Sequence, residues 1–162
     1  PSAVGGTRIG KWKKGQRLYE ETIRRARLAL KQGPPGKTRI AGAFWLQGES
    51  DSNTPKRIAE YPEALTGLID NLRADLGIPD LPFIAATIGE MRADIDNRKK
   101  INAILLGLPD KRPHTACVDA RAWKGHIGDK VHYDTATQEK IGRGYAAELL
   151  NMTGARPGRP RN

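Results

Sequence analysis

An aspartate and a histidine stand three residues apart in Asp129-Lys130-Val131-His132, directly before the last helical pattern of the chain. In a turn, this spacing can place the carboxylate against one ring nitrogen of the imidazole and fix its tautomer. The other ring nitrogen is then able to take a proton from a nucleophile. The same residues also fit a simpler interpretation, in which Asp129 caps the following helix beside an exposed histidine. The pair alone leaves both interpretations open.

Two further segments carry groups that can stabilise negative charge on an oxygen atom. Gly5 and Gly6 have backbone N–H groups that can approach an oxyanion closely, and Gln47 has a side-chain amide donor. Each has a structural alternative, because Gly-Gly is common in tight turns and Gln47 can hold its own loop. Glu49 and Asp51 can likewise be solvated loop acids or helix-start charges. Together these residues supply the parts of an oxyanion hole.

The other histidines and the single cysteine do not predict a metal site. His114 precedes a strand pattern, His126 lies in a glycine-rich loop, and neither has partners at metal-ligand spacing. Cys117 excludes an internal disulfide and a multi-cysteine metal site, and its apolar neighbours predict a buried strand position. We therefore expect no metal and no cofactor.

Length and composition predict one α/β domain with a hydrophobic core, at residues 1–154, followed by a basic Pro/Gly/Arg tail at 155–162. The chain has 162 residues, of which 38% are hydrophobic. No apolar run reaches the roughly 18 residues of a membrane span, and the first residues show no signal pattern, so no membrane partner is expected. The net charge is +10, with basic residues spread over helix faces and the tail and few aromatics among them, which favours a solvated surface over a nucleic-acid interface.

Hydrophobic periodicity predicts helices and strands that alternate along the whole chain. Apolar residues at helical spacing predict helices at 18–31, 55–76, 97–108 and 135–151. Short apolar runs predict strands at 39–46, 81–88 and 115–119. Such alternation requires parallel strands joined by crossover helices, which cover both faces of the sheet.

In a parallel sheet of this kind, chemistry gathers at the carboxyl ends of the strands. Here those ends lead into residues 47–51, 88–92 and 119–132. Two of these three segments carry groups suited to chemistry, among them Gln47 and His132.

Several motifs occur in a fixed order along nearly the whole chain. The most specific is Trp45-Leu46-Gln47-Gly48-Glu49-Ser50-Asp51, and Asp129-x-x-His132 ahead of a helix supports it. The others are Gly5-Gly6-Thr7, Trp12, Leu18-Tyr19-Glu20, Phe44, Tyr61, Leu72-Arg73-Ala74-Asp75-Leu76, Leu81-Pro82-Phe83-Ile84 and Val118-Asp119-Ala120. This combination resembles the sialate O-acetylesterase-like branch of the SGNH hydrolases, especially carbohydrate esterase family 6.

The resemblance implies a flavodoxin-like three-layer α/β/α sandwich and a Ser/Asp/His esterase that acts on acetylated sugars such as xylan or sialic acid. Carried over by position, His132 is the general base, Asp129 orients it, a glycine of the Gly5-Gly6 pair donates to the oxyanion from its backbone, and Gln47 donates from its side chain. The residues implied to support the site or bind substrate are Thr7, Glu49 and Asp51. Family members are often secreted or periplasmic, but these residues carry no visible signal, so the resemblance leaves the location open.

One part of the family pattern is missing from these residues. Family members begin with a strand and a Gly-x-Ser-type loop that holds the nucleophile, and this chain starts after that point. Ser2 is terminal, Ser52 lies in a loop, and Ser50 stands where the family has a structural serine. Recruitment of Ser50 is the alternative, although a nucleophile needs its base within hydrogen-bond reach and a strained elbow to present it. We therefore expect the nucleophile outside this chain, which is then a fragment, a processed form or an inactive homologue.

Two functions of different classes remain open. The first is a carbohydrate O-acetylesterase whose serine lies elsewhere, and the second is a catalytically silent carbohydrate-binding or interaction protein derived from the same fold. A missing first strand leaves a sheet edge uncovered. We therefore expect the chain to pair with an N-terminal segment or with another copy of itself, or to be less stable than a full homologue.

Overall fold

Helices and strands alternate from one end of the chain to the other. The structure, a computed structural model, describes residues 3–91 and 95–154, so the predicted tail at 155–162 lies outside the described residues. In chain order, the elements are the 3₁₀ helix η1 (Ile9–Trp12), α1 (Arg17–Gln32), β1 (Ala43–Trp45), α2 (Pro55–Leu76), β2 (Phe83–Ala86), α3 (Ile95–Leu106), β3 (Thr115–Val118) and α4 (Thr135–Thr153).

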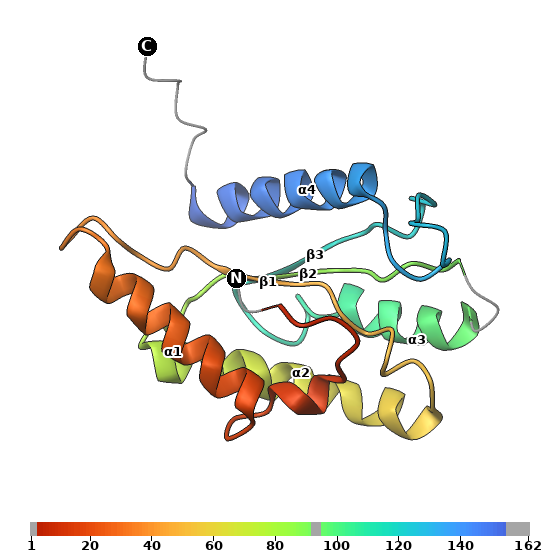
Figure 1. The fold of residues 1–162 in the computed structure, drawn as a ribbon, viewed down its shortest axis with the longest axis horizontal. Helices are drawn as coiled ribbons and strands as arrows, with labels where there is room; N and C mark the ends of the chain where they lie inside the picture. Colours follow the sequence, from red (N-terminus) through yellow and green to blue (C-terminus); the bar gives the residue numbers. More distant parts are fainter. Residues whose placement is uncertain (1–2, 92–94, 155–162) are drawn as a thin grey trace, which may run out of the picture.

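The three strands form a parallel sheet between two helical layers. The strand order is β1-β2-β3, with Ala43 opposite Phe83 and Phe83 opposite Thr115. Helices α1, α2 and α3 cover one face of the sheet, and α4 covers the other (Figure 1). The predicted α/β class, with a parallel sheet between helical layers, is confirmed.

Central strand β2 shows why the chain folds into three layers. Successive strand residues point to opposite faces, so Phe83 and Ala85 enter the core beneath α1–α3, whereas Ile84 and Ala86 enter the core beneath α4. All four residues are buried. A strand covered on both faces has no polar side to show, which is why this segment is a continuous apolar run in the sequence.

Helix boundaries follow capping residues. Helix α2 starts where the side chain of Thr54 accepts a hydrogen bond from the backbone N–H of Arg57 (3.3 Å), and it ends at Gly77, whose φ of 68° suits a glycine. Helix α4 starts at Asp134, which accepts from the backbone N–H of Thr137 (2.8 Å). The interpretation of Asp129 as the cap of this helix is therefore wrong, because Asp134 occupies the capping position.

The first strand is shorter than the sequence predicted. Residues 39–46 were expected to be extended in the sheet, but β1 covers only Ala43–Trp45. Its first bond to β2 runs from the N–H of Ala43 to the carbonyl of Pro82 (2.8 Å). Proline has no N–H to return a bond, so the ladder does not extend towards residue 39.

One edge of β1 lacks a partner strand among the described residues, since only β2 pairs with it. Phe44 and Leu46 keep 50% and 39% of their surface exposed there. A cavity of about 590 Å³ lies between this edge and α1, and its apolar lining includes Trp12, Leu72 and Phe83. Among the described residues, this edge of the sheet is therefore uncovered, as expected from the sequence.

Two smaller predictions concern Cys117 and the membrane. Cys117 lies in β3 and is partly buried, and this burial raises the pKa of its thiol to about 12. No helix within the described ranges is both long and apolar enough to cross a membrane.

Candidate active site

The segment after β1 forms a buried corner around Gln47. The side-chain nitrogen of Gln47 donates to the carbonyl of Thr7 (2.9 Å) and to the carboxylate of Asp51 (2.6 Å). The same Asp51 oxygen accepts from the backbone N–H of Ile9 (2.9 Å). Since Asp51 is only 3% exposed, its carboxylate joins the N-terminal segment to the strand end inside the protein.

Tyr61 of α2 stabilises this corner through two hydrogen bonds. Its hydroxyl accepts from the indole N–H of Trp45 (3.1 Å) and donates to the backbone carbonyl of Gln47 (2.8 Å). Complete burial raises the pKa of Tyr61 well above its usual value, so the hydroxyl keeps its proton and remains a donor. The position of Gln47 is thus set by α2 as well as by its own loop.

The turn in this corner requires a glycine at position 48. Gly48 has a φ of 154°, and a Cβ added there would lie 2.6 Å from the side chain of Ile101. Its carbonyl accepts the backbone N–H groups of Asp51 and Ser52 (3.1 and 2.9 Å). A larger residue would push α3 away from the end of β1.

The Asp129–His132 segment forms an exposed turn. One carboxylate oxygen of Asp129 lies 2.5 Å from Nδ1 of His132, and the other accepts the backbone N–H groups of Val131 and His132 (2.8 and 2.9 Å). An antiparallel bridge between His126 and Tyr133 closes the base of the turn. The contact leaves Nε2 as the ring nitrogen that can exchange a proton with substrate.

These bonds decide the charge of Asp129. The side-chain hydrogen bond with His132, followed by the two backbone hydrogen bonds, holds the pKa of the Asp129 carboxyl well below its usual range. The carboxylate is therefore ionised at neutral pH and stabilises a proton on Nδ1 of the ring.

The corner around Gln47 and the turn around His132 both line one cavity of about 360 Å³. His132, Gln47, Glu49 and the segment from Val4 to Thr7 all line it. Asp129 and Asp51 do not line it, and each stands behind the side chain that it contacts. The site residues suggested by the sequence thus lie around one cavity, except that Asp51 and Asp129 contact lining residues without lining the cavity themselves.

Some hydrogen-bond donors around the cavity already have an acceptor, and others have none among the described residues. Among the described residues, none accepts a hydrogen bond from the backbone N–H of Gly5 or Gly6, and Gly6 has a φ of 68° that suits a glycine. Both hydrogens of the Gln47 amide are engaged, and its Oε1 is a buried acceptor with no partner in the described part of the chain. For Gln47 to donate to an oxyanion, it must give up its bond to Thr7 or to Asp51.

Thr7 closes the N-terminal turn on one side of the cavity. Its hydroxyl donates to the carbonyl of Val4 (2.9 Å) and accepts from the indole N–H of Trp12 (3.1 Å). With both roles of the hydroxyl in use, Thr7 supports the Gly5-Gly6 backbone.

Several lining residues were not among those chosen from the sequence, and three of them are Arg98, Tyr133 and Gln138. Arg98 is 1% exposed and donates to the carbonyl of Gly89 (2.8 Å). Tyr133 directly follows His132, and Gln138 donates to the Tyr133 carbonyl (2.8 Å). Adjacency to His132 was a usable signal for Tyr133, whereas a charged residue in a helical pattern gives no sign that packing will bury it.

The segment after β2 takes no part in the cavity lining, at least over residues 88–91. Asn102 binds both the N–H and the carbonyl of Ile88 (2.8 and 2.9 Å) and also the Glu90 carboxylate (2.9 Å). Of the three strand ends, the first and third form the cavity, as their residue types suggested. Within residues 3–91 and 95–154, no three His, Cys, Asp or Glu side chains gather as a metal site would require.

Known proteins resemble this chain in sequence. The sequence pattern of a family described as carbohydrate esterase, sialic acid-specific acetylesterase, matches residues 1–151. A probable carbohydrate esterase of Arabidopsis thaliana is 34% identical over 151 residues, which cover 93% of this chain and 54% of that protein. The chain therefore spans about half the length of the curated relative that it matches.

Solved structures show the same fold. A protein of Arabidopsis thaliana superposes with a TM-score of 0.82 at 34% identity, covering 93% of this chain and 59% of that one. A carbohydrate acetylesterase of Xanthomonas citri superposes with a TM-score of 0.59 over 91% of this chain and 35% of its own length. At 18% identity, the second likeness concerns the fold alone.

Proposed function

The chain belongs to the carbohydrate esterase family of sialic acid-specific acetylesterases, and we propose that it carries the base and part of the oxyanion hole for the removal of acetyl groups from sugars. The observation that supports this most is the contact between Asp129 and His132 (2.5 Å) at a cavity also lined by Gly5 and Gly6. A base with a fixed tautomer beside unengaged backbone donors suits acyl transfer.

In the proposed reaction, a serine from outside these 162 residues attacks the acetyl carbonyl carbon. His132 accepts the serine proton on Nε2 as the oxygen–carbon bond forms, and then gives it to the sugar oxygen as the ester bond breaks. Water next attacks the acetyl-serine through the same base and releases acetate. Asp129 stays ionised throughout and stabilises the imidazolium.

The carbonyl oxygen becomes negative in each step and needs donors. The backbone N–H groups of Gly5 and Gly6 are suited to this, because neither has another acceptor among the described residues. Gln47 is proposed as the side-chain donor and breaks its bond to Thr7 in doing so, while Glu49 is proposed to bind a sugar hydroxyl or brace its loop.

The nucleophile is proposed to arrive on a strand beside β1. That edge is open among the described residues, and the apolar cavity along it can receive an extended segment. The carboxyl end of such a parallel strand would lie beside Gly5 and Gln47, which line both cavities. A second copy of this chain is the other proposed occupant of the edge.

Labelling with a fluorophosphonate probe tests the proposal. We expect no serine of residues 1–162 to react, and we expect the longest polypeptide that the gene encodes to react at a serine outside them and to release acetate from acetylated xylan or sialic acid. The His132→Ala variant should lose both. Labelling that survives in His132→Ala would contradict the role of the base.

Two outcomes would redirect the proposal. Labelling of Ser50 in the 162-residue chain would identify it as the nucleophile, since Ser50 also lines the cavity. Absence of labelling and of acetate release in the longest polypeptide would leave a catalytically silent carbohydrate-binding protein.

A further inference from the structure

The positive charge of the chain is concentrated in one stretch. Residues 8–39 contain eleven Lys and Arg residues and two Glu residues, a net charge of +9 within a total of +10. All eleven basic side chains are exposed. The other 17 Lys and Arg residues are spread over the rest of the chain, where 16 Asp and Glu residues nearly cancel their charge.

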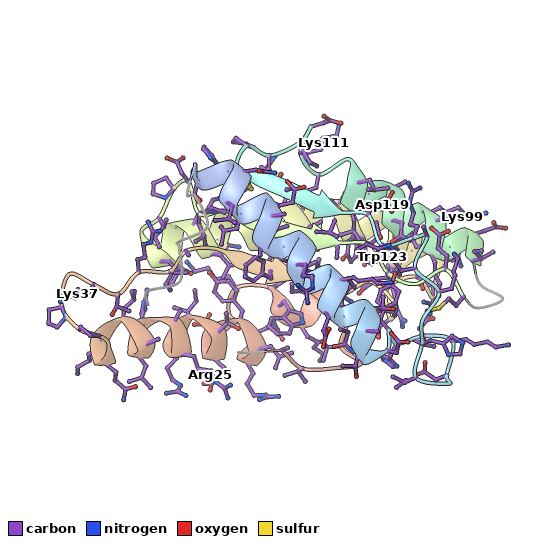
Figure 2. All side chains as sticks on the ribbon, turned by 90° about the horizontal axis from the view of Figure 1, so that it is seen from above. Arg25, Lys37, Lys99, Lys111, Asp119 and Trp123 are labelled. Carbon is purple, nitrogen blue, oxygen red and sulfur yellow. The ribbon has the colours of Figure 1, made fainter. Side chains whose placement is uncertain are left out.

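This basic stretch lies over η1 and α1. Figure 2 shows Arg25 and Lys37 on the side of the molecule formed by α1, with Lys99 and Lys111 away from it. On the inner part of α1, Glu21 pairs with Arg24 and Arg25 (2.7 and 2.6 Å), so some of the charge is locally balanced.

Charge is least balanced at the start of the stretch, around η1. Arg8, Lys11 and Lys13 form no ion pair within the described chain. They line a third cavity, of about 270 Å³, together with Arg57 of α2, whose guanidinium donates to the carbonyl of Ser50 (3.2 Å). Four cations thus surround one small space.

Two carboxylates also face this cavity. Asp51 is buried, and one of its oxygens already accepts from the backbone N–H of Ile9 and the amide of Gln47. Glu60 is exposed and lies 3.9 Å from Lys56 of its own helix. Four cations against these two acids leave an excess of positive charge at the cavity.

The basic cavity adjoins the candidate active site. Thr7 lines the active-site cavity and Arg8 lines the basic one, so consecutive residues form their common border. The hydrogen bonds of Gln47 to Thr7 and Asp51 form the wall between them (2.9 and 2.6 Å). The two cavities are therefore neighbours in the structure.

We propose that the cavity around Arg8, Lys11, Lys13 and Arg57 is a subsite for the carboxylates of an acidic glycan, so that the substrate is an O-acetylated polymer containing uronate units. This inference rests on the proposed function of the neighbouring cavity. At about 270 Å³ the space is smaller than the ~300–1,000 Å³ of pockets that enclose a whole ligand, which suits one unit of a longer chain.

Nucleic acid fits the same surface less well. Single-stranded nucleic acids bind to basic grooves through aromatic side chains on which bases stack. The aromatic residues near these cations in the sequence, Trp12, Tyr19 and Tyr61, are 8%, 0% and 0% exposed. A carboxylated sugar needs no stacking platform and is recognised by guanidinium and ammonium groups alone.

Binding, which needs no nucleophile, tests the subsite. The full chain is titrated by calorimetry with a galacturonate oligomer of about ten units, with a neutral xylose oligomer of the same length, and with a single-stranded DNA of equal charge. We expect the galacturonate oligomer to bind most tightly, and its affinity to fall as salt is raised. Equal affinity for the neutral oligomer, or tighter binding of DNA, would overturn the proposal.

Matched variants locate the binding surface. Since each exposed ion pair changes affinity about two- to fourfold, the triple variant Arg8→Gln, Lys11→Gln, Lys13→Gln should weaken galacturonate binding about tenfold or more. The control Lys99→Gln, Lys100→Gln, Lys111→Gln removes the same charge elsewhere and should change it less than twofold. Equal losses in both would mean that only net charge matters, and would refute the subsite.

Different results would refute the proposed subsite and the proposed esterase activity. Hydrolysis of neutral and acidic acetylated sugars at equal rates, with no effect of the triple variant, would keep the esterase and refute the subsite. Selective galacturonate binding without any acetate release from the longest polypeptide would keep the subsite as a carbohydrate-binding surface and refute the esterase.

Discussion

The corner around Gln47 and the turn around His132 face the same cavity but are built in opposite ways. Gln47 is 9% exposed and held by partners at Thr7 and Tyr61, far away in the sequence. The His132 side chain is 58% exposed, and its partner Asp129 is three residues away. The corner therefore depends on the folded protein around it, whereas the turn depends mainly on its own residues. Substitutions in the corner should therefore reduce mainly stability, and substitutions in the turn should reduce mainly catalytic activity.

The largest loss of stability is expected from Asp51→Ala in the corner. This change leaves the backbone N–H of Ile9 and an amide hydrogen of Gln47 buried without an acceptor, which costs about 2–4 kcal/mol. Urea unfolding at neutral pH measures the free energy of unfolding. Asp129→Ala, which removes an exposed carboxylate from the turn, is the control and should lower the midpoint urea concentration clearly less than Asp51→Ala does. Equal losses in the two variants would refute the contrast.

A smaller loss is expected from Tyr61→Phe. Without the hydroxyl, the indole N–H of Trp45 and the carbonyl of Gln47 lose a buried partner, at a cost of about 1–2 kcal/mol. Tyr133→Phe is a matched control, because the Tyr133 hydroxyl makes only long bonds of 3.3 and 3.4 Å. Thermal unfolding of both variants compares them, and a larger drop in Tm for Tyr133→Phe would show that the corner is not held by Tyr61.

In the turn, Asp129→Asn should change the chemistry without changing the fold. The neutral amide no longer stabilises a proton on Nδ1 of His132, so ester hydrolysis by the longest polypeptide should fall about 100-fold or more. The amide NMR spectrum should change only near residues 126–133. If the rate falls less than threefold, Asp129 does not orient the base.

The smallest effect concerns the pH dependence of the Asp129 carboxyl. Its pKa is lowered in the folded state, so its contribution to stability is complete above the ordinary range near pH 4 and is lost only as the pH falls through the lower, folded value. The ¹³C shift of the carboxyl should therefore stay that of an ionised group through pH 4. His132→Ala removes the largest cause and should move the titration back towards that of aspartate in a short peptide. An unchanged titration would show that His132 is not the cause.

Much of the fold could be predicted because its signals are local or periodic. Helix α2 begins at Pro55 and ends at Leu76 as predicted, since Thr54, Pro55 and Gly77 mark its ends in the sequence. The first strand was predicted too long, because whether residues 39–42 join the sheet depends on Pro82, which lies opposite them only after folding.

The sequence by itself determined the order of the elements and the parallel sheet, because periodicity and caps act over short distances. The three-residue spacing made the contact between Asp129 and His132 one of two possible interpretations. Only the tertiary structure decided that both amide hydrogens of Gln47 are engaged and that Arg98 is buried against the cavity. It also placed the cations around η1 next to that cavity. These features join residues far apart in the chain, and no spacing in the sequence specifies which distant groups will meet.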